Sequence, residues 1–405
     1  MSGLDTEGYF RVISKQAKSL ARSIRRSTIS LVQSNLSPLR SCAEGSRVPD
    51  EVLLHIGLAK TGTTSIQQFC VENTAKLLDC GMLYPQTGQH GPGHQMLGLA
   101  SLAADQRTAD IVDRTPVGQA QLFDQIATEF ERTGPSVRSI LLSSERFGAM
   151  DLEAIERLRS LLPGIRVRPI VYLRRQDLMA ESLFAQGMRV RGKARNDRPL
   201  NPGRAQFPVL RFRVLIERWA SVFGRENMIV RKFEKRPDGK DVVADFLEAI
   251  GATEIERGDR SYHLNTKLSR DALEYLYFHT DLVYDSPEYE SVQRKLIEYS
   301  RRQPTPIEHR NFYSPKQRIA VLKNHEADNR IVAREYFGEE TLFSGKLPTL
   351  DDPWESYPGL STSTLKMISD FVESYQLPRR KRTLESRVRN GIKSIGAMDW
   401  MRRSA

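Results

Sequence analysis

The 405-residue chain is predicted to be an α/β protein, with a central parallel sheet, helices on both of its faces and a mainly helical C-terminal part. Apolar runs of strand length alternate with segments of helical periodicity, which is typical of a parallel sheet with crossover helices. The first apolar run also leads through a short Gly/Thr/Lys turn directly into a helical pattern. We expect strands at 52–56, 139–142, 167–173 and 228–230, and helices that begin at Thr63, Leu152, Gln176 and Val242.

The first strand and its turn, residues 52–67, have the sequence V-L-L-H-I-G-L-A-K-T-G-T-T-S-I-Q. A helix that begins here offers unpaired N–H groups and the positive end of its dipole, which together favour an anion. Lys60 adds a full positive charge. Hydroxyl groups come from Thr61, Thr63, Thr64 and Ser65. We therefore expect a phosphate or sulfate group at this turn; the alternative is an ordinary strand-to-helix turn with a solvated lysine.

The turn differs from the nucleotide-triphosphate loop, G-x-x-x-x-G-K-[ST], in which lysine follows the second glycine. Gly57 and Gly62 have the spacing of that loop, but Thr63 follows Gly62 and Lys60 precedes it by two residues. The sequence thus indicates a phosphate loop of another type.

A second candidate anion-binding element lies at 170–186, I-V-Y-L-R-R-Q-D-L-M-A-E-S-L-F-A-Q. Arg174 lies at the end of the expected strand, and Ser182 follows eight residues later within the helix. The planar fork of arginine suits a phosphate group, because it donates in pairs to phosphate oxygens. The alternative is an arginine that caps a strand and a serine on a helix face.

Together these motifs resemble the sulfotransferase superfamily. A-K-T-G-T-T at 59–64 is similar to its P-K-[ST]-G-T-T loop, with Ala59 in place of proline, and the Arg/Ser pair is similar to its 3′-phosphate element. The resemblance implies the P-loop-like sulfotransferase fold and the donor 3′-phosphoadenosine 5′-phosphosulfate, released as the 3′,5′-bisphosphate. The donor-binding residues it implies are Lys60, Thr61, Gly62, Thr63, Thr64, Ser65, Arg174 and Ser182.

Weaker segments resemble the bacterial carbohydrate-type sulfotransferases, which places the resemblance over roughly 51–343. One segment is S-S-E at 143–145, and a second is the block at 228–251, which consists of a strand, the sequence R-K-F-E-K and a helix. The other two are L-N-T-K-L-S at 264–269 and the segment at 328–338. The resemblance implies a sulfotransferase acting on a hydroxyl of a carbohydrate or glycolipid. The alternatives are a nucleotide-dependent kinase and a non-catalytic membrane-surface binding module on the same fold.

Sulfuryl transfer needs charge stabilisation on the leaving phosphate and a base for the acceptor proton. Lys60 and the N–H groups of residues 61–64 suit the first role, and no metal is required. Glu145 is the first candidate base and His94 the second. The alternatives are a capping or ion-paired Glu145 and a loop His94 without a catalytic role; we expect His55, within the first strand, to be a core residue.

The net charge of +11 is concentrated in the two ends of the chain. Residues 1–49 carry eight basic and three acidic residues, and 379–405 carry nine basic and two acidic, which leaves 50–378 near −1. A nucleic-acid-binding protein would show a basic face on the fold itself, so we do not expect one. We predict a basic arm at 1–49, a sulfotransferase domain at 50–378 whose helical acceptor-side portion begins near 265, and a basic tail at 379–405.

Both ends have apolar residues at helical spacing with basic residues between them, a pattern typical of helices on anionic membrane surfaces. The alternatives are a solvated arm, a helix packed on its own domain, or a transit peptide at the start. Three cysteines without metal or disulfide spacing, and no apparent signal peptide or spanning segment, predict a cytoplasmic protein, peripheral at the inner membrane surface.

Overall fold

The structure is a computed structural model that describes residues 47–101, 118–190, 208–236, 238–256, 267–279, 282 and 286–375. Residues 1–46 of the predicted basic arm, the basic tail at 379–405 and the polar loop at 192–206 lie outside these residues, and so do residues 264–266. The described residues fall into two compact units. The first comprises those within 47–183, 208–256 and 315–352, and the second those within 184–190, 267–314 and 353–375.

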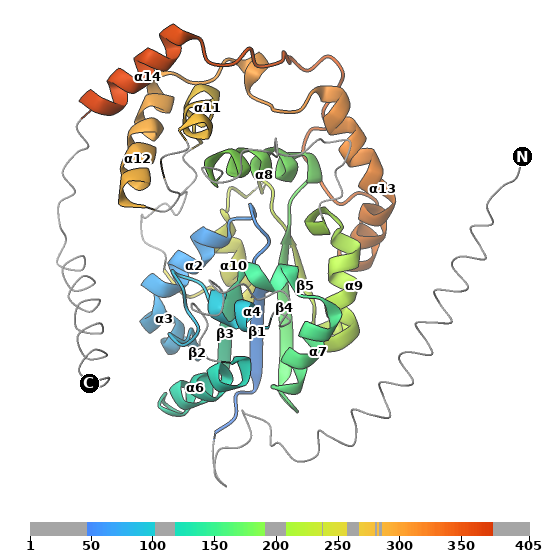
Figure 1. Cartoon of the computed structure of the whole chain (residues 1–405). Coiled ribbons are helices and arrows are strands. Elements are labelled where there is room, and N and C mark those ends of the chain that lie inside the picture. Colours follow the sequence, from blue (N-terminus) through green and yellow to red (C-terminus); the bar gives the residue numbers. More distant parts are fainter. Residues whose placement is uncertain are drawn as a thin grey trace, which may run out of the picture. The chain divides into compact units, whose positions relative to one another are not determined.

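The first unit is built on a five-stranded sheet with the order β2-β3-β1-β4-β5, in which all neighbouring strands are parallel (Figure 1). Ile56, the last residue of β1, pairs with Ser144 of β3 and with Val171 of β4. The carboxyl ends of the three central strands therefore meet at one edge. The strands are β1 (Glu51–Ile56), β2 (Met82–Leu83), β3 (Ser139–Ser144), β4 (Arg166–Leu173) and β5 (Ile229–Lys232).

Helices cover both faces of this sheet, which confirms the predicted α/β class. α2 and α10 pack together on one face, while α9 contacts β4 and packs against α7 on the other (Figure 1). The helices of this unit are α2 (Thr63–Glu72), α3 (Thr74–Asp79), α4 (Gln95–Ala100), α6 (Gln119–Glu131), α7 (Leu152–Ser160), α9 (Phe212–Phe223), α10 (Val242–Ile250), α13 (Pro315–Phe337) and the first two turns of α8 (Gln176–Val190).

The predicted strands and helix starts agree with the structure to within two residues at each end. β3 runs two residues further than predicted, because the polar Ser143 and Ser144 continue the ladder and are themselves buried. The two-residue strand β2 carries too short a pattern to be predicted. The buried serines matter for the site, since they bring Glu145 directly to the end of β3.

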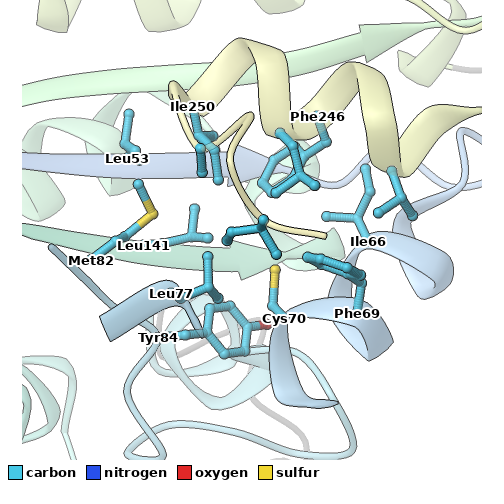
Figure 2. Close-up of a cluster of buried hydrophobic side chains, with 14 of the residues drawn as sticks. Leu53, Ile66, Phe69, Cys70, Leu77, Met82, Tyr84, Leu141, Phe246 and Ile250 are labelled. Atoms are coloured by element: carbon cyan, nitrogen blue, oxygen red, sulfur yellow. The ribbon is translucent and has the colours of Figure 1, made fainter. Parts of the chain in front are cut away.

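The core of the first unit explains why consecutive residues of β1 are apolar. Leu53 and Leu54 point to opposite faces, and both are fully buried, as expected for a strand covered on two sides. On one face Leu53 joins Ile66 and Phe69 of α2 and Phe246 of α10 (Figure 2). This packing fixes both helices, whose N-termini lie beside the candidate site.

Helices are the only regular secondary structure among the described residues of the second unit, in agreement with the predicted helical C-terminal part. A separate apolar core includes Met188, Leu276, Leu296 and Ile368. Its helices are the end of α8, α11 (Arg270–Phe278), α12 (Pro287–Arg302) and α14 (Thr362–Ser374), and serine side chains cap the last three. Within the described residues, no helix has both the length and the apolar character that a bilayer span requires.

Candidate functional site

The turn between β1 and α2 is held in shape by its own side chains. The hydroxyl groups of Thr61 and Thr63 donate to the carbonyl oxygen of Leu58, at 2.7 and 3.0 Å, and both threonines are buried. These hydrogen bonds stabilise the loop and use both hydroxyl protons. A ligand would therefore bind to these residues through their backbone N–H groups. In the described part of the chain, the N–H groups of residues 61–64 donate to no protein acceptor.

Gly62 caps α2 in the left-handed conformation, with φ of 81°. A Cβ atom there would lie 2.8 Å from Cγ1 of Val242 and 2.9 Å from Cε2 of Phe233. Phe233 follows β5, and Val242 begins α10. The glycine thus allows the loop to pack closely on the two elements that follow β5.

We expect Gly62→Ala to destabilise the fold by about 2–3 kcal/mol, because it adds left-handed strain and displaces Phe233. Gly118→Ala is the matched control, since Gly118 has φ of −68° and open space around its Cβ position. Urea denaturation of the two variants measures the difference. Equal stability of the two would contradict the close packing at Gly62.

Lys60 itself has φ of 71°, the left-handed region that non-glycine residues rarely adopt. Its side chain is half-buried and lies near enough to Glu145 to affect the pKa of that carboxyl. A lysine kept in a conformation that favours glycine suggests that its charge is needed at this place.

Arg174 lies directly after β4 and contacts the loop. Its Nη1 donates to the carbonyl oxygen of Lys60 at 2.8 Å, and its guanidinium lies 5.5 Å from the centre of the Phe233 ring. Phe233 is held in turn by a 2.7 Å hydrogen bond from its N–H to the carbonyl oxygen of Leu173. The two predicted phosphate elements, more than a hundred residues apart in the chain, are therefore in direct contact.

A buried ion cluster holds the turn that carries Arg174. Asp177 is fully buried and accepts hydrogen bonds from Arg175, at 2.7 Å, and from Arg318 of α13, also at 2.7 Å. Arg175 also donates to the carbonyl oxygens of Gly345 and Lys346. Since every donor and acceptor in this cluster comes from the first unit, the turn has a rigid support.

A cavity of about 560 Å³ opens beside the loop and Arg174. Leu178 of α8 lines this cavity, and Ser182 does not. Ser182 lies one helical turn after Leu178, on the same face of α8. The lining residues are Gly62, Ser65, Tyr172, Arg174, Leu178, Lys232, Phe233, Glu234, Lys235, Arg236, Gly239, Lys240, Asp241, Val242 and Asp245.

Asp245, one of the residues that line this cavity, accepts several hydrogen bonds. Asp245 accepts from Tyr172 at 2.7 Å and from Arg231 at 2.6 and 2.8 Å, and it also pairs with Arg236. Burial alone would raise the pKa of Asp245, but the hydrogen bonds from Arg231 and Tyr172 outweigh it and hold the pKa below its ordinary value. This cluster ties α10 to β4 and β5.

We expect Asp245→Asn to lower the free energy of unfolding by about 2–3 kcal/mol, less than the loss of a fully buried pair because the arginines are partly exposed. A depressed pKa means that the stabilisation is complete above the unfolded value of 3.8 and is lost as the pH falls through the folded value. Urea denaturation between pH 2 and 7 should therefore show a shallower pH dependence in the variant. An unchanged pH profile would contradict this role.

Glu145 follows β3 directly and stands at the same sheet edge as the loop. The N–H of Gly57 donates to the carbonyl oxygen of Ser144 at 3.0 Å, which joins the ends of β1 and β3. Glu145 is exposed to solvent, yet protein atoms surround its carboxyl closely enough to affect the pKa of that group. Burial raises the pKa of Glu145, and the positive charges of Lys60 and Arg146 oppose this rise only in part.

His94 is buried, and both of its ring nitrogens are engaged. Nδ1 accepts from the N–H of Ser143 at 3.1 Å, so Nε2 carries the proton and donates to the carbonyl oxygen of Pro85 at 2.9 Å. Burial lowers the pKa of His94 to about 4. This arrangement favours the alternative in which His94 has no catalytic role and connects its loop to β3.

His55 is a core residue, as its position within β1 indicates. Its Nδ1 lies 2.7 Å from the hydroxyl oxygen of Ser143, and its ring packs on Phe246 and Tyr172. Burial lowers the pKa of His55 to about 3.

Phe233 and Asp245 were not predicted as site residues, because their roles depend on contacts between separate elements. The R-K-F-E-K block was the sequence feature nearest to them.

The fold and this edge define an α/β protein with a basic loop, an arginine and a cavity at the carboxyl ends of a parallel sheet. Comparisons with known proteins add little to that description. No protein-family model matches the chain. An uncharacterized protein from Archaeoglobus fulgidus is 29% identical over 210 residues, which are 50% of this chain and 55% of the relative. The chain therefore spans about half the length of that relative.

A solved structure with local likeness is the sulfotransferase from Alicyclobacillus acidocaldarius. It is 17% identical, with a TM-score of 0.33, over 53% of this chain and 87% of the other. A likeness of this extent assigns no substrate or reaction, and the function has to be argued from the site.

Proposed function

We propose that the chain is a sulfotransferase that transfers a sulfuryl group from 3′-phosphoadenosine 5′-phosphosulfate to a hydroxyl of a carbohydrate or glycolipid. The observation that carries this proposal is the 2.8 Å hydrogen bond from Arg174 to the Lys60 carbonyl oxygen. It joins the two motifs that resemble the donor-binding elements of sulfotransferases, at the sheet edge where ligands of such folds bind.

In the proposed reaction the acceptor oxygen attacks sulfur, and the bond between sulfur and the bridging phosphate oxygen breaks. The proton of the acceptor hydroxyl passes to Glu145, and adenosine 3′,5′-bisphosphate leaves. Lys60 and the N–H groups of residues 61–64 stabilise the charge that develops on the leaving phosphate. The Glu145 carboxyl is suited to the base role because burial raises its pKa.

The remaining residues would hold the donor. Arg174 and Ser182 would bind its 3′-phosphate, and the cavity beside Phe233 would hold the adenosine. Ser65 lines the same cavity, next to the loop. Among the described residues, no group of histidine, cysteine, aspartate and glutamate side chains is arranged to hold a metal ion. The proposed chemistry uses none.

Calorimetric titration with adenosine 3′,5′-bisphosphate and with ATP tests the donor. We expect the bisphosphate to bind more tightly than ATP. A preference for ATP would contradict the proposal and favour the kinase alternative. The acceptor requires a screen of glycans and glycolipids with labelled donor. If the chain binds the bisphosphate but sulfates nothing, the non-catalytic binding module becomes the better explanation.

We also propose that the basic ends, of which only residues 47–49 are among the described residues, attach a cytoplasmic enzyme to an anionic membrane surface. Their charge and apolar spacing support this. Flotation with anionic liposomes should separate the full chain from a version limited to 50–378. Equal partitioning of the two would remove the idea.

A further inference from the structure

The cavity beside the loop has five basic side chains, and three of them are already neutralised. Lys232 pairs with Glu339 at 2.7 Å. Arg236 pairs with Asp238 at 2.7 Å, and Lys240 pairs with Glu248. Each of these three cations therefore already has a carboxylate partner in the protein.

The acidic side chains of the lining are engaged as well. Asp245 holds the cluster described above, and Glu234 accepts from the N–H and the hydroxyl of Ser344, each at 3.1 Å. Asp241 caps α10 by accepting from the N–H groups of Val243 and Ala244. The lining carboxylates are thus committed to other partners.

Arg174 and Lys235 are the two basic lining residues that form no ion pair within the described part of the chain. Among the described residues, Arg174 donates a hydrogen bond to a neutral carbonyl oxygen alone and contacts the Phe233 ring. Lys235 is exposed and makes no hydrogen bond within the described residues. The two residues follow the ends of β4 and β5, which are neighbouring strands with Leu173 opposite Lys232.

A phosphomonoester carries a charge of about −1.5 to −2 at neutral pH, so one arginine balances only part of it. We propose that Lys235 supplies the second charge for the donor's 3′-phosphate and makes the site selective for 3′-phosphorylated nucleotides. The inference depends on the proposed function, because it names a further residue for the same donor. Arg174 would bind the phosphate through its fork, and Lys235 would bind it as a point charge.

Titration calorimetry with adenosine 3′,5′-bisphosphate and adenosine 5′-monophosphate tests this selectivity. We expect Lys235→Met to weaken the bisphosphate by roughly tenfold and to leave the monophosphate unchanged. Lys323→Met is the matched control: Lys323 is an exposed lysine on another cavity of the same unit, without a hydrogen bond or ion pair among the described residues. It should change neither affinity.

The outcomes separate this inference from the proposed function. Wild-type protein that prefers ATP would overturn the proposed function and this inference together. Wild-type protein that prefers the bisphosphate, with Lys235→Met as strong a binder, would overturn the role of Lys235 alone. An equal loss for both nucleotides would also overturn it, since a general effect of charge carries no selectivity. Thermal melting should show that the exposed substitution leaves the fold intact.

Discussion

Substitution of Lys60 by glycine is expected to abolish sulfuryl transfer while leaving the protein at least as stable as the wild type. Lys60 has φ of 71°, where a side chain costs roughly 1–2 kcal/mol. Glycine relieves this strain but loses about 0.5–1 kcal/mol of chain entropy, so stability should rise by about 0–1.5 kcal/mol. Activity should fall by about 10²–10³-fold or more, because the leaving phosphate loses its counter-charge.

Two further variants separate charge from strain. Lys60→Ala removes the charge and keeps the strained backbone, so it should be as inactive as the glycine variant and less stable. Lys60→Arg keeps the charge and should retain measurable turnover. Activity with labelled donor, together with urea denaturation of all three, measures both effects. Normal turnover of the glycine variant would exclude Lys60 from the chemistry, and a glycine variant less stable than the alanine variant would contradict the strain.

The parts of this site that lie at strand ends were predictable from the sequence. Parallel strands place their carboxyl ends at one edge, so Lys60, Glu145 and Arg174 were expected at the same edge once three buried strands were identified. The strand order, which makes β3, β1 and β4 neighbours, was not predicted. Apolar runs made those strands easy to identify.

Contacts between separate elements were not predictable in the same way. The role of Phe233 depends on the absence of a side chain at Gly62 and on the bond that aligns it with Leu173. His94 has a loop sequence around it, yet it is buried because its ring nitrogens satisfy two backbone groups. Such pairings depend on three-dimensional packing, which periodicity does not encode.

Substitution of Glu145 by glutamine is expected to lower turnover by about 10²–10⁴-fold with the affinity for adenosine 3′,5′-bisphosphate retained. The amide keeps the shape of the side chain but cannot take up the proton of the acceptor's hydroxyl group. Removal of a negative charge near Lys60 should not weaken an anionic ligand. Single-turnover rates and calorimetric titration measure the two quantities separately, and Glu145→Asp, which keeps the carboxylate, should remain partly active.

The pH profile distinguishes Glu145 from His94 as the base. A base acts only when deprotonated, and burial raises the pKa of Glu145, so wild-type turnover should fall with acid at a pH above the ordinary value of 4.5. His94 has a pKa lowered to about 4, which would place its own acid limb lower. The residual turnover of Glu145→Gln should lack the acid limb above pH 4.5 that belongs to Glu145. Near-normal turnover of this variant, with the limb retained, would mean that another group takes the proton, since the glutamine side chain does not titrate.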